Sequence, residues 1–362
     1  MNIRTLKYTA IFTGPVVGYV SLTQPGWWTW ALPLYVYLLI PLIELFAKGS
    51  EKNMSVAEEE MAKKDAVYDY FLYAQLPVQY AFIVLFLFGI TQPELTIVEY
   101  SGRILTMGIT CVSLGINVGH ELGHRARPHE RIMAKLFLLS TLYMHFIIEH
   151  NRGHHKRVAT DEDPASARYG EIIYFFMIRS IVFGFISAWK LEAARLKAKG
   201  YSFWSWRNEM IHFQLIQVFF VGLIYYGFGL VGMLSFIVAA ILGVLMLETI
   251  NYVEHYGLRR KQKDNGAYEK ILPTHSWNSN HYVGRIMLFE ITRHSDHHYK
   301  SSRPYQVLRH FDEAYQMPTG YPGMILLALI PPIWFYVMHR RINKLMEQNQ
   351  LHPDRILHAT DG

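Results

Sequence analysis

The sequence predicts an all-α integral membrane protein with six transmembrane helices in three hairpins and a cytoplasmic, histidine-rich helical cap. Composition gives the first indication, because 51% of the 362 residues are hydrophobic and 15% are aromatic, which is high for a soluble protein. Several apolar segments also have the length of a bilayer crossing. Histidines are clustered in the polar stretches that lie between or after these segments.

The N-terminal region predicts the first hairpin. Basic residues precede the apolar stretch Tyr8–Leu22, and no small-residue cleavage site follows it, so we expect a retained span rather than a signal peptide. A turn at Gln24 leads into a second apolar stretch, Trp27–Phe46, whose first tryptophans suit a membrane interface.

The second hairpin follows a polar segment, Lys48–Asp69. Within it, Ser55 and Glu58 have the spacing of a capping box and predict a short helix in a loop. Tyr70–Ile90 and Ile104–Val118 are the two apolar arms of this hairpin, and the first histidines come just after the second arm.

Orientation follows from the distribution of lysine and arginine. The turns at Gln24 and Gln92 contain neither residue. Basic residues flank the opposite ends of the spans: Arg4, Lys7, Lys48, Lys52, Lys63, Lys64, Arg125 and Arg127. Because positive residues concentrate on the cytoplasmic side of a membrane, we expect the histidine side to be cytoplasmic.

The central segments are apolar but are not expected to cross the bilayer. Ile132–Ile148 begins after one histidine group and ends at the next, so both of its ends lie on one side if the groups form one site. We expect this segment to lie along the membrane. The same is expected of Ile172–Trp189, which Arg179 interrupts, and of the aromatic, charged stretch Lys199–Arg207.

Two further apolar regions follow. Phe213–Phe228 and Val231–Tyr252 are joined by a glycine-rich, uncharged turn and form the third hairpin, which brings the spans to six. Tyr321–Met338 contains Pro331 and Pro332, which would break a helix, so it is expected at the membrane surface. Four regions result: hairpins one and two (1–119), a cytoplasmic or interfacial segment (120–210), hairpin three (211–254) and a cytoplasmic C-terminal region (255–362).

Nine histidines fall into tight groups whose spacing predicts a metal site. His150 and His154 are four residues apart and would share one face of a helix, from which the adjacent His155 reaches towards a second centre. Nine imidazoles are too many for one metal and suit two, each with an open position. The nine are His120, His124, His150, His154, His155, His255, His294, His297 and His298. The ungrouped histidines are expected to be ordinary ones: His129, His145, His212, His339, His352 and His358.

An all-histidine shell is neutral, so nearby carboxylates should balance the charge of the metals. They would accept hydrogen bonds from the free ring N–H groups and fix the tautomers. The candidates are Glu121, Glu149, Asp161, Asp163, Glu248, Glu254, Glu290 and Asp296.

The residues alone leave other chemistries open. HELGH, His120–His124, fits the HExxH pattern of zinc metalloproteases with Glu121 as the base, but it leaves six histidines unexplained. A carboxylate-bridged di-iron site would use the pairs Glu121–His124 and Glu209–His212, and it would leave both adjacent histidine pairs unused. A membrane metal sensor or carrier, with no enzymatic activity, is a third alternative.

Composition also narrows the partners. Cys111 is the only cysteine, so we expect no disulfide, no cysteine-ligated zinc and no iron–sulfur site, and any electrons must come from another protein. The formal net charge is +6, but lysine and arginine are scattered beside apolar segments. A nucleic-acid partner is therefore not expected.

The motifs resemble those of the integral-membrane non-haem di-iron alkane 1-monooxygenases, within the wider histidine-box superfamily that includes membrane fatty-acid desaturases. HELGH, EHNRGHHKRVATDEDPASAR and LFEITRHSDHHY are similar to the three boxes of that family. NYVEHYGL, Asn251–Leu258, is similar to a signature of the alkane hydroxylases and separates the chain from desaturases. The resemblance covers nearly all of the chain, to about Pro322.

This resemblance implies two iron ions held by the nine grouped histidines. The reaction it implies is terminal hydroxylation of medium-chain n-alkanes to primary alcohols with O2 and two electrons. A rubredoxin, itself reduced by an NAD(P)H-dependent reductase, would supply the electrons. The implied location is the bacterial inner membrane, with the active site on the cytoplasmic side. A membrane fatty-acyl desaturase, or another hydrocarbon hydroxylase of the superfamily, is the nearest alternative.

That chemistry predicts a substrate channel and a docking surface for the electron donor. A channel through the bundle would hold the alkane by apolar contact, and its candidate caps on the second span are Tyr35, Tyr37, Leu38 and Ile40. Basic residues beside the histidines would meet an acidic rubredoxin, unless they only follow the positive-inside rule. These are Arg152, Lys156, Arg157, Arg259, Arg260 and Lys263.

Overall fold

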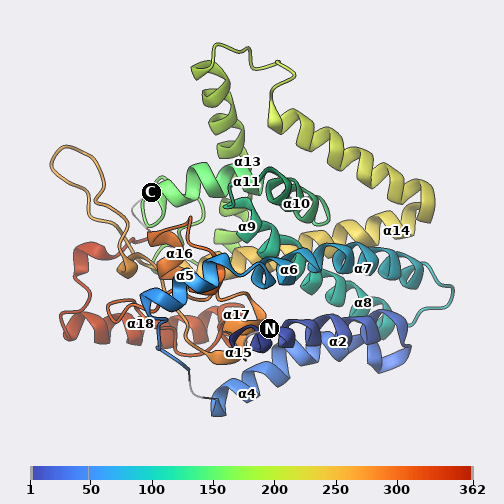
Figure 1. The fold of residues 1–362 in the computed structure, drawn as a ribbon, viewed down its shortest axis with the longest axis horizontal. Coiled ribbons are helices and arrows are strands. Elements are labelled where there is room, and N and C mark those ends of the chain that lie inside the picture. The colour runs from blue at the N-terminus through green and yellow to red at the C-terminus, as the bar shows by residue number, and fades with distance from the viewer. Residues whose placement is uncertain (1–2, 48, 360–362) are drawn as a thin grey trace.

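The computed structural model describes residues 3–47 and 49–359, and within them it is helical (Figure 1). Over this part of the chain there is no β-strand, and only four isolated bridges are formed. Five helices are long and apolar enough to cross a bilayer, or six if one bent pair counts as a span. The expected all-α membrane protein is therefore confirmed, whereas the order of six spans in three hairpins stays a prediction.

The N-terminal region forms a helical hairpin with a short first arm. The chain continues from α1 (Ile3–Leu6) through a 3-10 turn into α2 (Thr13–Thr23), which has 11 residues and is too short to cross a bilayer alone. The second arm runs through α3 (Ala31–Leu34) and a π-helical turn to α4 (Ile40–Phe46). Lys48, one of the basic residues that indicate the orientation of the spans, lies outside the described residues.

Both arms of the expected second hairpin are helical. The capping box of Ser55 and Glu58 opens α5 (Val56–Lys64), as expected. The first arm comprises α6 (Val67–Tyr73) and α7 (Gln75–Ile90), and the second comprises α8 (Ile97–Thr110), a π-helical segment and α9 (Asn117–Gly123). Figure 1 shows α7 and α8 running alongside α2.

The central segment carries the second histidine group on short helices. It consists of α10 (Pro128–Leu139), α11 (Phe146–Glu149), a π-helical turn (His150–His154) and α12 (His155–Arg157). None of these passes the length and hydropathy test for a span. By contrast α13 (Ile173–Ala198) passes that test with 26 residues. In Figure 1 it extends across the direction of α2, α7 and α8, so its expected position along the membrane stays a prediction.

The third hairpin is a bent helix. α14 (Glu209–His255) contains one non-helical residue, Gly229, with φ 65° and ψ −170°. Such a backbone conformation is open to glycine at little cost, and it falls at the glycine-rich turn that the sequence predicts. The arms 209–228 and 230–255 meet there at the right of Figure 1, and the second arm returns to the histidines.

The C-terminal region closes the site. α15 (Tyr282–Met287) and α16 (His294–Tyr299) are short, and α16 carries the last histidine group. α17 (Tyr321–Ala328) and α18 (Pro331–Glu347) meet at a bend of 120°. The break falls at Pro331, where the sequence predicts it.

Candidate metal centre

All nine grouped histidines converge where α9, the 150–157 segment, the end of α14 and α16 meet, and they divide into two groups. In each group the possible ligand atoms lie within 4.8 Å of one another. We call the larger set the five-histidine group, which contains His120, His124, His150, His155 and His297. The four-histidine group contains His154, His255, His294 and His298.

The five-histidine group points its Nε2 atoms at a common space. His155 Nε2 lies 2.9 Å from His150 Nε2 and 3.0 Å from His297 Nε2, and His297 Nε2 lies 3.0 Å from His120 Nε2. The buried Nε2 atom of His124 has no hydrogen-bond partner. One ring nitrogen cannot donate to two others, so hydrogen bonds alone leave lone pairs facing each other. A cation among them would accept those lone pairs.

The four-histidine group has the same convergent form. His154 Nε2 lies 3.2 Å from His298 Nε2, and His294 Nε2 lies 3.2 Å from His255 Nε2. All four side chains are buried, whereas His124 and His155 of the other group are only half-buried. The two groups therefore differ in their access to solvent.

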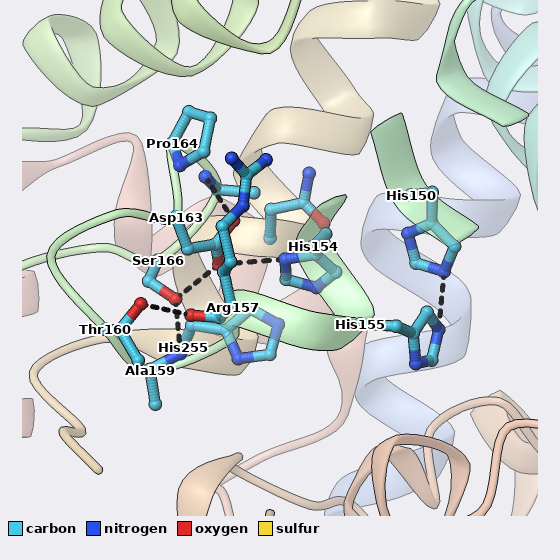
Figure 2. Close-up of polar contacts among 12 residues, drawn as sticks. His150, His154, His155, Arg157, Ala159, Thr160, Asp163, Pro164, Ser166 and His255 are labelled. Carbon is cyan, nitrogen blue, oxygen red and sulfur yellow. Dashed lines mark hydrogen bonds and ion pairs between the residues drawn. The ribbon is translucent and has the colours of Figure 1, made fainter. Parts of the chain in front are cut away.

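A π-helical turn decides which group each central histidine joins. His150–His154 is π-helical, and a π-helix pairs residue i with i+5 rather than i+4. His150 therefore faces His155, while His154 faces the four-histidine group (Figure 2). The expectation that His150 and His154 share a face is wrong for this reason, whereas His120 and His124 do join the same group.

Burial keeps the imidazoles neutral. It lowers the pKa of the ring in His150, His155, His294, His297 and His298 well below the usual value, and neighbouring imidazoles lower it further. A neutral imidazole keeps the lone pair that a metal requires. The donor set, its protonation and the unpartnered His124 nitrogen thus fit a pair of metal ions.

Two of the expected carboxylates contact histidines of the four-histidine group. His154 Nδ1 donates to Asp163 Oδ2 at 2.9 Å, and Asp163 also accepts from Ser166 Oγ at 2.6 Å (Figure 2). Burial opposes ionisation of Asp163, but these contacts outweigh it and lower its pKa to about 2. Glu254 Oε1 lies 3.1 Å from His294 Nδ1.

The other expected carboxylates contact arginine, lysine, amide or hydroxyl groups. Arg125 holds Glu121, Arg157 holds Glu149, and Arg259 holds Asp161. Tyr143 and Asn251 donate to Glu248. Lys7, Tyr8 and Arg285 surround Glu290, and Arg303 and the Arg309 amide bind Asp296. Burial raises the pKa of Glu149 to about 7 despite Arg157. These contacts, with a cation in every case except Glu248, hold the side chains away from the histidines.

The geometry speaks against both alternative metal sites. A zinc protease would need Glu121 free to act as a base, yet Arg125 holds it at 2.7 Å and the Tyr305 amide also donates to it. The second ExxH pair lies elsewhere: Glu209 pairs with Lys135, and the ring of His212 lies 4.6 Å from that of Trp206 at a tilt of 59°. Neither Glu209 nor His212 belongs to a histidine group.

A cavity of about 150 Å³ connects the bundle to both histidine groups. Its walls are mostly apolar, and His120, His150 and His294 are among the polar residues that line it. Of the candidate caps, Tyr35, Tyr37 and Ile40 line it. Leu38 is not among its lining residues and has 53% of its surface exposed.

Most of the expected docking residues have partners within the chain. Arg152 pairs with Glu192 and Glu209. Arg260 donates to the carbonyl oxygens of Lys156 and Glu269. Arg157 and Arg259 pair with the carboxylates named above. This leaves Lys156, which follows His155, and Lys263 exposed at the surface.

Sequence reasoning missed three polar residues that support the four-histidine group. Ser166 binds Asp163, Ser276 Oγ lies 3.5 Å from His255 Nδ1, and Tyr321 donates to Glu254. Ser166 follows Asp163 by three residues, and that spacing was a usable signal. Ser276 and Tyr321 lie far from their partners in sequence, so no local pattern could have indicated them.

Comparison with known proteins gives a family to this geometry. Residues 101–328 match the sequence profile of the family described as "Fatty acid desaturase". The chain is 39% identical to "Alkane 1-monooxygenase 1" of Pseudomonas aeruginosa over 88% of this chain and 84% of that protein. The chain belongs to the alkane 1-monooxygenase family. Similar values hold for "Alkane 1-monooxygenase 1" of Alcanivorax borkumensis, at 38% over 92% and 85%. "Alkane 1-monooxygenase" of Ectopseudomonas oleovorans is 40% identical over 89% and 80%.

This alkane 1-monooxygenase family member is therefore an enzyme, an oxidoreductase, and a multi-pass membrane protein. The family resemblance stated from the sequence motifs is confirmed. All four histidine-bearing stretches lie inside the matched segment 101–328. The family and the convergent histidines agree on a metal-dependent reaction at this site.

Proposed function

We propose that the enzyme hydroxylates the terminal carbon of medium-chain n-alkanes. In the overall reaction R–CH3, O2, two electrons and two protons give R–CH2OH and water. The observation that carries the proposal is the apolar cavity, because His120, His150 and His294 of the two histidine groups are among the residues that line it. A substrate without a polar group can be held only by shape and apolar contact.

The histidines would hold two iron ions, one in each group. Bound there, the two ions would supply O2 activation and accept the two electrons. The chain itself orients the ligands: Asp163 fixes the Nδ1 proton of His154, which leaves Nε2 for the metal. Apolar walls around the cavity exclude bulk water from the reacting carbon.

Rubredoxin, reduced by an NAD(P)H-dependent reductase, is the electron donor in this proposal. The single cysteine, Cys111, is buried, so the described residues offer no cysteine site for electron storage. Two half-buried histidines, His124 and His155, mark the side where an electron carrier would approach the metals. We place this side in the cytoplasm and the enzyme in the bacterial inner membrane, because basic residues flank the histidine end of the spans.

The decisive experiment uses the purified enzyme in detergent. Iron is counted per chain, the protein is reduced without oxygen, and it is then exposed to O2 and octane before product analysis. About two irons per chain and 1-octanol would support the proposal. Iron without alcohol would overturn alkane hydroxylation and favour the desaturase alternative, which predicts an alkene from an acyl substrate. One bound zinc without O2 uptake would overturn the di-iron site itself.

A further inference from the structure

A buried tyrosine of the C-terminal region reaches the four-histidine group through a carboxylate. Tyr321 is 2% exposed and stands at the first position of α17. Its hydroxyl donates to Glu254 Oε1 at 2.6 Å. Glu254 precedes His255 at the end of α14, so Tyr321 ties the C-terminal segment to a ligand-bearing helix.

The same oxygen also faces a histidine. Glu254 Oε1 lies 3.1 Å from His294 Nδ1, a buried nitrogen that has no hydrogen-bond partner in the structure. With the proton on Nδ1, the lone pair of His294 is on Nε2, which points at His255 Nε2 at 3.2 Å. The orientation of Glu254 therefore decides which nitrogen of His294 is presented to a metal.

A parallel arrangement exists on the other side of the group. There Ser166 donates to Asp163 at 2.6 Å, and Asp163 accepts from His154 Nδ1. Each carboxylate thus accepts a hydrogen bond from one hydroxyl and has one imidazole Nδ1 atom beside it. Among the described residues, no carboxylate is within hydrogen-bonding distance of a ring nitrogen of the five-histidine group.

We propose that Tyr321 is a positioning residue: its hydroxyl fixes Glu254 so that His294 presents Nε2 to the metal of the four-histidine group. This inference rests on the proposed function, because it assumes metal at the histidines. It assigns the effect of Tyr321 to one group only. The alternative is that Tyr321 contributes only to the wall of the substrate cavity, which it also lines.

The test measures metal binding rather than turnover, with Co²⁺ as the probe on the metal-free, full-length protein in detergent. In a titration against a competing chelator, Tyr321→Phe should weaken one of two Co²⁺ equivalents about tenfold and leave the other unchanged. Tyr315→Phe is the matched control. Tyr315 is also a buried tyrosine of this region, but its hydroxyl donates to the Gln350 carbonyl, away from the histidines. The Tyr315→Phe variant should bind both Co²⁺ equivalents with the affinities of the parent protein.

A double variant separates positioning from packing. If Tyr321 acts through Glu254, Glu254→Gln should weaken the same equivalent at least as much, and Tyr321→Phe should add nothing to it. Additive losses, or an unchanged Co²⁺ titration with a raised KM for alkane, would overturn the inference and make Tyr321 a cavity wall. A parent protein that binds no Co²⁺ would instead overturn the proposed metal site, so the two failures are distinguishable.

Discussion

His154 Nδ1 lies 2.9 Å from Asp163 Oδ2, and both side chains are buried. The carboxylate is held in turn by Ser166 Oγ at 2.6 Å and by the amide of Ala165. Ser166 shares Oδ2 with the imidazole and the Ala165 amide holds Oδ1, so the carboxylate cannot rotate away and the Nδ1 proton of His154 has a fixed partner. Its Nε2 atom therefore faces His298 with a lone pair.

We expect Asp163→Asn to weaken metal binding at the four-histidine group by about 10- to 100-fold, because an amide is a poorer acceptor for the imidazole. Asp161→Asn is the control. Asp161 is two residues away but pairs with Arg259 at the surface and contacts no histidine. Metal content after dialysis against a chelator, measured for both variants, checks the prediction. Equal loss in the two variants would show that the loop as a whole, and not the contact with His154, retains the metal.

Glu290 should make the folded state sensitive to acid. Burial alone would raise its pKa, but Arg285 and Lys7 outweigh burial and lower the pKa to about 2. A carboxylate with a depressed pKa stabilises the fold above its usual pKa of 4.5, and this contribution is lost as pH falls towards 2. The free energy at stake is about 3 kcal/mol. Thermal unfolding of the metal-free protein from about pH 6 down to about pH 2 measures it.

The variants for this measurement are Glu290→Gln and Glu60→Gln. Glu60 is an exposed partner of Lys63, so its removal should change neither stability nor pH dependence appreciably. Glu290→Gln should unfold at lower temperature at neutral pH, because Lys7 and Arg285 lose their buried partner. It should also show a flatter decline on acidification. A decline as steep as the parent's would assign the acid sensitivity to other groups, such as the histidines.

The sequence was sufficient to find the nine histidines and the family. Local spacing identifies the histidines because each group occupies a short stretch of sequence. The segments that carry them converge because α9, α14 and α16 all reach the same side of the bundle. The helix break at Gly229 and the bend at Pro331 were also predictable, since glycine and proline determine them locally.

The division of the histidines was not predictable from spacing. An α-helical reading pairs His150 with His154, but a π-helical turn pairs His150 with His155. The histidines of α16 lie against His154 and His155 only in the folded chain, so sequence spacing does not show this division. The partners of the carboxylates were not predictable from local sequence either. Glu290, for example, contacts Lys7, which is 283 positions away in the sequence.

Docking of the electron carrier should depend on few lysines. Four of the six expected basic residues have partners within the chain, so Lys156 and Lys263 are the ones available to an acidic protein. We expect Lys156→Glu with Lys263→Glu to slow reduction by rubredoxin about tenfold at low salt, and the difference should shrink as salt rises. Stopped-flow reduction at several ionic strengths measures this. Lys197→Glu with Lys199→Glu, at the far end of α13, is the control of equal charge change and should behave as the parent.

Tyr37 should limit the length of alkane that the enzyme accepts. Its side chain lines the cavity that reaches His120, so Tyr37→Ala would lengthen the apolar space for the substrate. Each methylene that finds apolar room is worth about 0.8 kcal/mol, or about fourfold in kcat/KM. In competition between n-alkanes of increasing length, this variant should shift the products towards longer alcohols. Leu38→Ala, on the same helix but outside the cavity, removes a similar apolar side chain and should leave the distribution unchanged. A shift in both variants would mean that substitution loosens the helix generally, whereas a shift in Tyr37→Ala alone places the end of the substrate beside that ring.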